Sequence, residues 1–128
     1  MKYKENLKID NELDKSSLES IDEKQILEKA KKENKKIMDY ATSKSCYFCK
    51  KMEREVLSLD EVTKKINQHY IFVKIDVDEK SLPFELIKEY RKITPTFFIL
   101  SQKGKYIKQY PGAWVKKDFI EILEENKK

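Results

Sequence analysis

The sequence predicts an α/β domain in which helices cover both faces of one central mixed β-sheet. Segments with strand-like and helix-like patterns alternate along most of the chain, and two strands joined through a helix normally pair in parallel. The last two predicted strands form a hairpin, which adds antiparallel strands to the same sheet. A chain of 128 residues has room for one domain only, so all these elements must share one fold.

The N-terminal part of the chain is predicted to contain a tail and a first helix. Residues 1–16 are polar with few apolar side chains, so we expect a tail with at most one short strand near residues 6–9. The folded domain is expected to span residues 17–128. A serine at its start can cap a helix, whose loose apolar stripe continues to about Asn34.

Two strands and an interrupted helix are predicted in the middle of the chain. Residues 36–42 are short and partly β-favouring, which indicates the first strand. A helix begins at Cys46, breaks near Asp60, where this residue can cap a continuation, and ends at about Gln68. Residues 70–77 form the clearest strand, because β-branched and aromatic residues dominate them.

The C-terminal part is predicted to hold a helix, a hairpin and a last helix. A helix is expected over residues 81–90, since a serine can cap it and a proline fits its first turn. Residues 96–100 indicate a buried strand, and residues 105–110 pair with it across a turn in which Gly104 is free to take a positive φ. Residues 115–126 are amphipathic and predict the last helix.

The composition is that of a polar but folded domain. Hydrophobic residues make up 39% and charged residues 40%, and seven Tyr, six Phe and one Trp argue against disorder along most of the chain. The 28 Lys and Arg exceed the 23 Asp and Glu, but the two signs are interleaved, which is typical of a solvated surface rather than a nucleic-acid-binding stripe. No apolar run approaches the roughly 18 residues of a membrane span, so we expect no membrane insertion.

The two cysteines, Cys46 and Cys49, are the residues most informative about function. They follow a predicted strand and open a helix, where unpaired N–H groups and the helix dipole favour an anion. Because the thiolate is the nucleophile in thiol–disulfide exchange, this placement activates the first cysteine. Their spacing on one helical turn lets the second cysteine resolve a mixed disulfide on the first, so the pair predicts a redox function.

Two other interpretations of the pair are weaker. A structural zinc site needs about four ligands, and the chain offers only two Cys and one His. The other interpretation is a purely structural disulfide or an inert buried thiol pair, and a disulfide between such close residues removes little chain entropy.

A second signal is Pro95, which immediately precedes the predicted strand over residues 96–100. Proline cannot donate a hydrogen bond to a sheet, so it is typical of the first residue of a strand. From this position alone a trans peptide bond is the expectation, because only about 5–6% of X–Pro bonds in folded proteins are cis.

Together, residues 46–49 (Cys-Tyr-Phe-Cys) and 94–96 (Thr-Pro-Thr) in this order of elements resemble the thioredoxin superfamily. More specifically, the chain is similar to bacterial thioredoxin-like proteins, often exported, that carry a Cys-x-x-Cys-Lys-Lys-Met stretch, here residues 46–52. The resemblance covers about residues 26–123. It implies the thioredoxin fold and a protein thiol–disulfide oxidoreductase.

The resemblance implies roles for five residues. Cys46 would be the nucleophile and Cys49 the resolving thiol. Pro95 would be a cis-proline that faces the disulfide, and Thr94 would lend backbone contacts to a bound substrate peptide. Gly112 matches a family glycine that lets the substrate approach.

Lys74 matches a family lysine that neighbours a buried acid. Asp39 is the only acid in the first predicted strand, but it lies seven residues before Cys46, one more than in the family pattern. Two alternatives therefore stay open: Asp39 accepts the proton of Cys49, or it points to solvent, because the strand register decides which face it occupies.

Aromatic residues near the cysteines are candidates for substrate binding. Tyr47 and Phe48 replace the Gly-Pro pair of family thioredoxins, and if exposed they would form a docking surface for unfolded or partner polypeptide. Trp114 either borders the substrate groove or, as we favour, packs beneath the last helix.

The sequence thus predicts a thioredoxin-like enzyme that exchanges protein disulfides, most simply as a reductase, since a histidine that would favour a strong oxidant is absent between the cysteines. A disulfide oxidase or isomerase is the alternative, and a non-catalytic interaction module is the alternative from another class. We expect a monomer that needs no metal, flavin or nucleotide and receives electrons from a partner protein. No secretory signal is visible, yet two cysteines confined to one motif suit an oxidising compartment, so we expect the bacterial periplasm, with the cytoplasm as the alternative.

Overall fold

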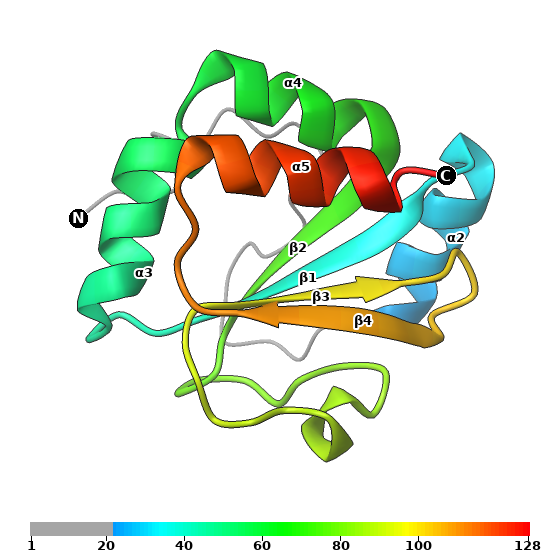
Figure 1. Ribbon diagram of the computed structural model, residues 1–128. Coiled ribbons are helices and arrows are strands. Elements are labelled where there is room, and N and C mark those ends of the chain that lie inside the picture. Colours follow the sequence, from blue (N-terminus) through cyan, green and yellow to red (C-terminus); the bar gives the residue numbers. More distant parts are fainter. Residues whose placement is uncertain (1–21) are drawn as a thin grey trace.

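The computed structural model describes residues 22–128, which form a four-stranded mixed sheet with helices on both faces (Figure 1). The α/β class is therefore confirmed. The predicted tail over residues 1–16, with its short strand near 6–9, lies outside the described residues, as does the predicted start of the first helix at residue 17. No helix in the described part of the chain has both the length and the apolar character needed to cross a membrane.

The sheet has the strand order β2-β1-β3-β4. The central strand β1 (Lys36–Thr42) pairs in parallel with β2 (Tyr70–Asp76) and antiparallel with β3 (Thr96–Leu100). β4 (Tyr106–Pro111) pairs antiparallel with β3 and closes the predicted hairpin. All four strands lie where the sequence predicts them, because each is either rich in β-branched and aromatic residues or joined to its partner by a short turn.

Helices are present in the described residues at all the predicted positions except residues 81–90, and one of them is followed by a change in geometry. They are α2 (Glu23–Glu33), α3 (Tyr47–Met52), α4 (Asp60–His69) and α5 (Lys116–Asn126). The change follows α3, where the chain widens into a π-helical turn, η1 (Glu53–Leu57), before α4 begins. A wider turn shifts the register of the side chains, so that Glu53, Val56 and Leu57 are all buried.

The prediction of a helix over residues 81–90 is wrong. The structure has a long irregular connection there, with a single 3-10 turn, η2 (Leu86–Lys88). Phe84 and Glu85 have φ values of 56° and 59°, in the left-handed region that an α-helix does not use. Four apolar side chains of this segment pack on the sheet from an irregular backbone, and their spacing resembles a helical stripe in the sequence; they are Leu82, Phe84, Leu86 and Tyr90.

The core has two halves, one on each face of the sheet. Met38 and Tyr40 of β1 face the half that α4 and α5 cover, whereas Ile37 and Ala41 face the half that α2 and the β2–β3 connection cover. Figure 1 shows α4 and α5 side by side on their face. Because side chains alternate along a strand, Asp39 belongs to the α2 face.

Asp39 is fully buried, and neither of its carboxylate oxygens has a hydrogen-bond partner within residues 22–128. Burial, with a smaller contribution from the charge of Glu23, raises the pKa of Asp39 well above its ordinary value. Folding therefore favours the protonated form of this side chain more than the unfolded chain does.

Asp39→Asn should change how stability depends on pH. Unfolded, Asp39 ionises near its ordinary pKa of about 3.9, so the folded protein binds more protons than the unfolded chain between that pH and the raised pKa. Wild-type stability therefore falls as pH rises through this interval, by at most about 1.4 kcal/mol per pH unit, whereas the variant has no such loss. Urea denaturation measures the free energy of unfolding. Relative to wild type, this free energy should be more favourable for the variant at pH 8 than at pH 5.

The exposed Asp118→Asn change is the matched control, because this residue lies at the surface of α5 and should show little pH-dependent difference. A difference between Asp39→Asn and wild type that stays constant from pH 5 to pH 8 would contradict a buried, protonated Asp39.

Candidate active site

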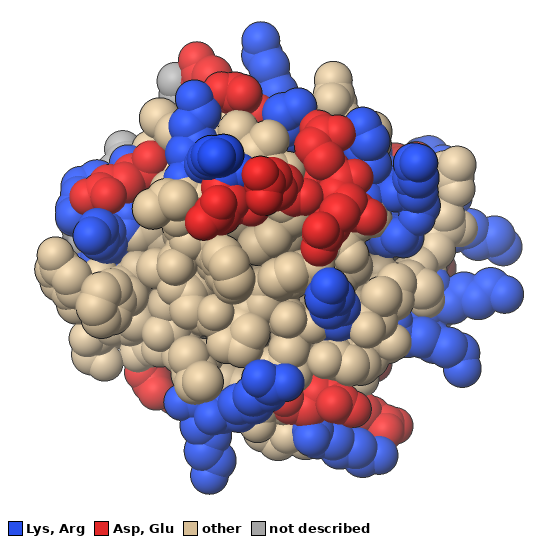
Figure 2. All heavy atoms as spheres, viewed as in Figure 1, with Lys and Arg blue, Asp and Glu red and all other residues tan. Residues whose placement is uncertain are grey.

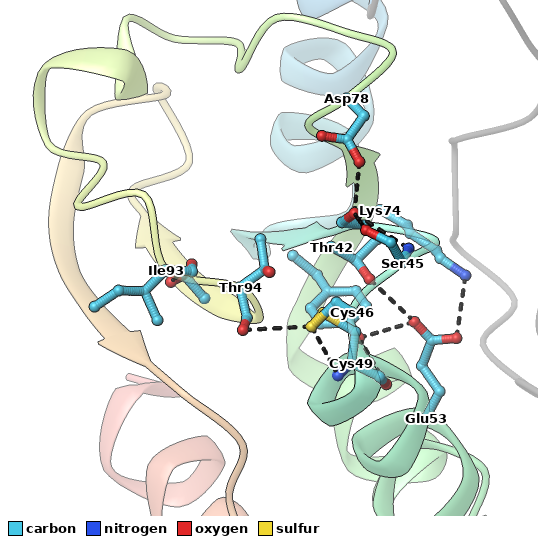
Figure 3. Close-up of a disulfide and its surroundings, with 12 residues drawn as sticks. Thr42, Ser45, Cys46, Cys49, Glu53, Lys74, Asp78, Ile93 and Thr94 are labelled. Atoms are coloured by element: carbon cyan, nitrogen blue, oxygen red, sulfur yellow. Dashed lines mark hydrogen bonds and ion pairs between the residues drawn. A yellow bond between two sulfur atoms is a disulfide. The ribbon is translucent and has the colours of Figure 1, made fainter.

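Cys46 and Cys49 form a disulfide at the start of α3, with their Cα atoms 5.2 Å apart (Figure 3). Cys46 is the N-cap of the helix, and its Sγ accepts a hydrogen bond of 3.1 Å from the backbone N–H of Cys49. Cys49 is fully buried, whereas Cys46 is partly exposed. Only the first sulfur is therefore accessible to an approaching polypeptide.

Local sequence explains why the helix begins at Cys46. Its backbone is extended (φ −90°, ψ 112°), as an N-cap requires, and a sulfur atom takes the place of the usual oxygen acceptor. No acidic residue lies in the first turn of α3, and the basic residues Lys50 and Lys51 lie in its last turn. The unpaired N–H groups at this end therefore face the Cys46 sulfur without a competing carboxylate.

The structure brings Thr94, Pro95 and Gly112 to the same site. The Thr94–Pro95 peptide bond is cis, and the carbonyl oxygen of Thr94 lies 3.4 Å from Sγ of Cys46. The N–H of Gly112 donates a hydrogen bond of 2.7 Å to the carbonyl of Pro95. Gly112 has φ 98°, which favours glycine, and a Cβ placed there would meet no atom within 4 Å. The space beside this glycine is therefore open.

Exposed aromatic side chains adjoin the reactive sulfur. Tyr47 and Phe48 are 64% and 56% exposed, and their rings pack edge to face with centroids 5.2 Å apart. Ile93, which precedes Thr94, is 42% exposed. In Figure 2 uncharged side chains cover much of the left part of the molecule, where α3 begins, and charged side chains lie mostly around its border.

Of the two positions considered for Trp114, the structure shows the one in which it packs beside the last helix. It is half-buried against the core half that α5 covers, and its ring meets that of Tyr110 edge to face with centroids 6.0 Å apart. Its backbone N–H donates to Sδ of Met52 over 3.3 Å, which ties the loop before α5 to the end of α3. Trp114 therefore connects the loop before α5 to the core and to the helix that carries the cysteines.

Asp39 takes neither of the two positions that the sequence left open. It is not exposed to solvent, and it lies on the α2 face of β1, opposite the face that packs on the cysteine-bearing helix. Tyr40, six residues before Cys46, occupies the position where the family pattern places an acid. Asp39 is thus separated by the sheet from Cys49 and from Lys74.

The acid beside the disulfide is Glu53, which the sequence analysis missed. It is 4% exposed, and its Oε1 pairs with Nζ of Lys74 at 3.5 Å. Its Oε2 accepts a hydrogen bond from the hydroxyl group of Thr42 at 3.3 Å (Figure 3). It accepts another from the hydroxyl group of Tyr40 at 2.9 Å. The signal that could have found it is its spacing, four residues after Cys49, which puts both on one helical face.

Tyr40 links this acid to the cysteine pair. Its buried hydroxyl lies 3.4 Å from the carbonyl oxygen of Cys49 as well as 2.9 Å from Glu53. Burial, followed by the negative charge of Glu53, raises the pKa of Tyr40 well above its ordinary value, so this side chain stays a neutral donor. Within the described residues, no cluster of three or more His, Cys, Asp or Glu side chains is arranged to hold a metal ion.

Comparisons with known proteins identify relatives of this architecture. Residues 23–127 match the thioredoxin-like domain family, and no curated protein sequence matches the chain. A thioredoxin from Thermus thermophilus is 26% identical, with a TM-score of 0.67 over 86% of this chain and 87% of that one. Thioredoxin NaTrxh from Nicotiana alata is 25% identical, with a TM-score of 0.67 over 94% and 96% of the two chains. The predicted thioredoxin fold is therefore confirmed.

Lys74→Met should destabilise the fold, because it leaves the buried charge of Glu53 without its cation. Removing one partner of a buried ion pair typically costs about 3–5 kcal/mol, so a loss of about 2–4 kcal/mol is expected in the free energy of unfolding, measured by urea denaturation at pH 7. The double variant Lys74→Met/Glu53→Gln should recover part of that loss.

Lys88→Met serves as a control, since its ion pair with Glu85 is exposed and should contribute little. If Lys74→Met is as stable as this control variant, the pair at Glu53 does not hold the site together.

Proposed function

The chain belongs to the thioredoxin-like domain family, and on this premise we propose that it reduces protein disulfides through a mixed disulfide on Cys46. The proposal rests mainly on one observation. The partly exposed sulfur of Cys46 caps a helix and accepts a hydrogen bond from the backbone N–H of the buried Cys49. That arrangement stabilises a thiolate on Cys46, which is the nucleophile the reaction needs.

The exchange proceeds in two steps. In the reduced protein the Cys46 thiolate attacks one sulfur of a client disulfide, and the other client sulfur leaves as a thiolate that takes a proton from solvent. Cys49 then loses its proton to solvent and attacks Sγ of Cys46, which releases the second client sulfur. The client gains two electrons and two protons, and the protein is left with the Cys46–Cys49 disulfide that the structure shows. A dithiol donor protein returns the two electrons.

Client recognition is proposed to use the surface around Cys46. Tyr47 and Phe48 present apolar area to an unfolded or flexible segment, and the backbone at Thr94 is close enough to the sulfur to contact the residues that flank a client cysteine. The open space at Gly112 lets the client backbone approach. These contacts depend little on client sequence, which suits a protein with several clients.

We favour the reducing direction because no histidine lies between the cysteines to stabilise the thiolate further. Thioredoxin-type reductases have reduction potentials near about −270 mV, whereas strong oxidants lie near about −120 mV. A measured reduction potential near about −120 mV would assign the protein to disulfide formation or isomerisation.

We also propose that the protein works as a monomer in the bacterial periplasm. The chain has only two cysteines, and both are in the active motif, so no further thiol could mispair in an oxidising compartment. The proposed chemistry uses the cysteine pair itself and requires no bound cofactor.

Wild-type protein should accelerate the reduction of insulin by dithiothreitol. Cys46→Ala should abolish this acceleration, because the nucleophilic sulfur is missing. Cys49→Ala should instead trap a covalent mixed disulfide with the client, visible on a non-reducing gel, because the resolving sulfur is missing. Rates relative to dithiothreitol alone provide the baseline.

Wild-type protein that catalyses no Cys46-dependent turnover, and a Cys49→Ala variant that traps no client, would point to a non-catalytic interaction module instead.

A further inference from the structure

The buried carboxylate of Glu53 has no part in the two steps above, although it lies one helical turn after Cys49. The backbone N–H of Glu53 donates to the carbonyl of Cys49, so the two residues stand one above the other on the same helical face. Helical side chains tilt towards the N-terminus, and Cβ atoms four residues apart are about 5–6 Å apart. The carboxylate is therefore directed over the turn that carries Cys49.

Three neighbouring side chains hold the carboxylate of Glu53 in one place. Hydrogen-bond donors from three residues surround its two oxygens: the hydroxyl groups of Tyr40 and Thr42 on Oε2, and the ammonium of Lys74 at Oε1. Hydrogen bonds to the charged form of a carboxylate favour that form.

The charge is also oriented with respect to the cysteine pair. Oε2 lies on the side of the Tyr40 hydroxyl, which itself lies 3.4 Å from the carbonyl of Cys49, whereas Oε1 lies on the side of Lys74. The ammonium that partly balances the charge is therefore at the far oxygen. Figure 3 shows the carboxylate between the cysteine pair and the Lys74 ammonium.

The other ionisable groups around this turn do not cancel the effect. Tyr40 is neutral, and Asp39 lies on the opposite face of the sheet. Lys50 and Lys51 are only partly buried and reach solvent, which screens them. A thiolate on the buried Cys49 would thus lose its hydration and lie beside a negative charge, and both effects oppose it.

We propose that Glu53 slows the resolving step by opposing the thiolate form of Cys49, so that the mixed disulfide on Cys46 persists at neutral pH. This inference rests on the proposed function, since it concerns the second step of that exchange. Persistence of the covalent complex gives a client time to rearrange or to meet a second thiol. Tyr40, Thr42 and Lys74 act as positioning residues that hold the charge in place.

Titration of Cys49 tests the inference without any client. In the Cys46→Ser background Cys49 is the only cysteine, so the ultraviolet absorbance of the thiolate reports on it once the tyrosine ionisation measured in Cys46→Ser/Cys49→Ala is subtracted. Its midpoint should lie above the ordinary thiol value of about 8.5, and Glu53→Gln should lower it by about one pH unit. Glu55→Gln is the matched control, because its side chain is 51% exposed and should leave the midpoint unchanged.

Release of a client peptide from a preformed mixed disulfide on Cys46 gives the second readout. At pH 7 Glu53→Gln should speed release about threefold, because a midpoint one unit lower gives about ten times more thiolate, and each thiolate is about three times less nucleophilic. Slower release in Glu53→Gln would make the carboxylate a proton acceptor and overturn the inference, as would an unchanged or higher midpoint.

The wild-type Glu53 background remains informative should Glu53→Gln fail to fold, as judged by near-ultraviolet circular dichroism. A Cys49 midpoint at or below about 8.5 in Cys46→Ser alone already contradicts the inference. Failure of the proposed function is read separately, because a protein without insulin-reducing activity still yields the titration.

Discussion

The whole account depends on the junction between β1 and α3, where the chain leaves the sheet and turns into a helix at Cys46. A cysteine at the N-cap receives the N–H groups that the first helical turn cannot satisfy internally, and one of them, from Cys49, reaches the sulfur. In the proposed mechanism this interaction stabilises the thiolate of Cys46, whereas Cys49 is buried behind it. The asymmetry between the two sulfurs, and so the order of the two steps, follows from this junction.

The two buried acids show how the faces of the sheet differ. Asp39 lies under α2 without a hydrogen-bond partner in the described residues, and burial raises the pKa of its carboxyl group well above the ordinary value. Glu53 lies on the other face, where two hydroxyl groups and an ammonium group hold its charge beside the disulfide. The position that a strand acid takes in the family pattern is filled by Tyr40, and the helix supplies the acid in its place.

Much of the fold could be predicted from the sequence because its strong signals are local. The strands over residues 36–42 and 96–100 and the helix start at Cys46 follow from side-chain type and spacing. The segment over residues 81–90 could not be predicted, since left-handed backbone at Phe84 and Glu85 leaves no mark in an apolar pattern. In the site, the cysteine pair was accessible to sequence reasoning. Glu53 was missed: its spacing from Cys49 indicates a shared helical face, but its burial depends on a π-helical turn and on contacts with a distant strand.

The most direct test of the central claim is the rate at which iodoacetamide alkylates Cys46 in the reduced protein as pH is varied. The account predicts a single transition with a midpoint clearly below the ordinary thiol value of about 8.5, with the buried Cys49 unmodified until much higher pH. A midpoint at or above that value, or a Cys46 that resists the reagent when reduced, would contradict it.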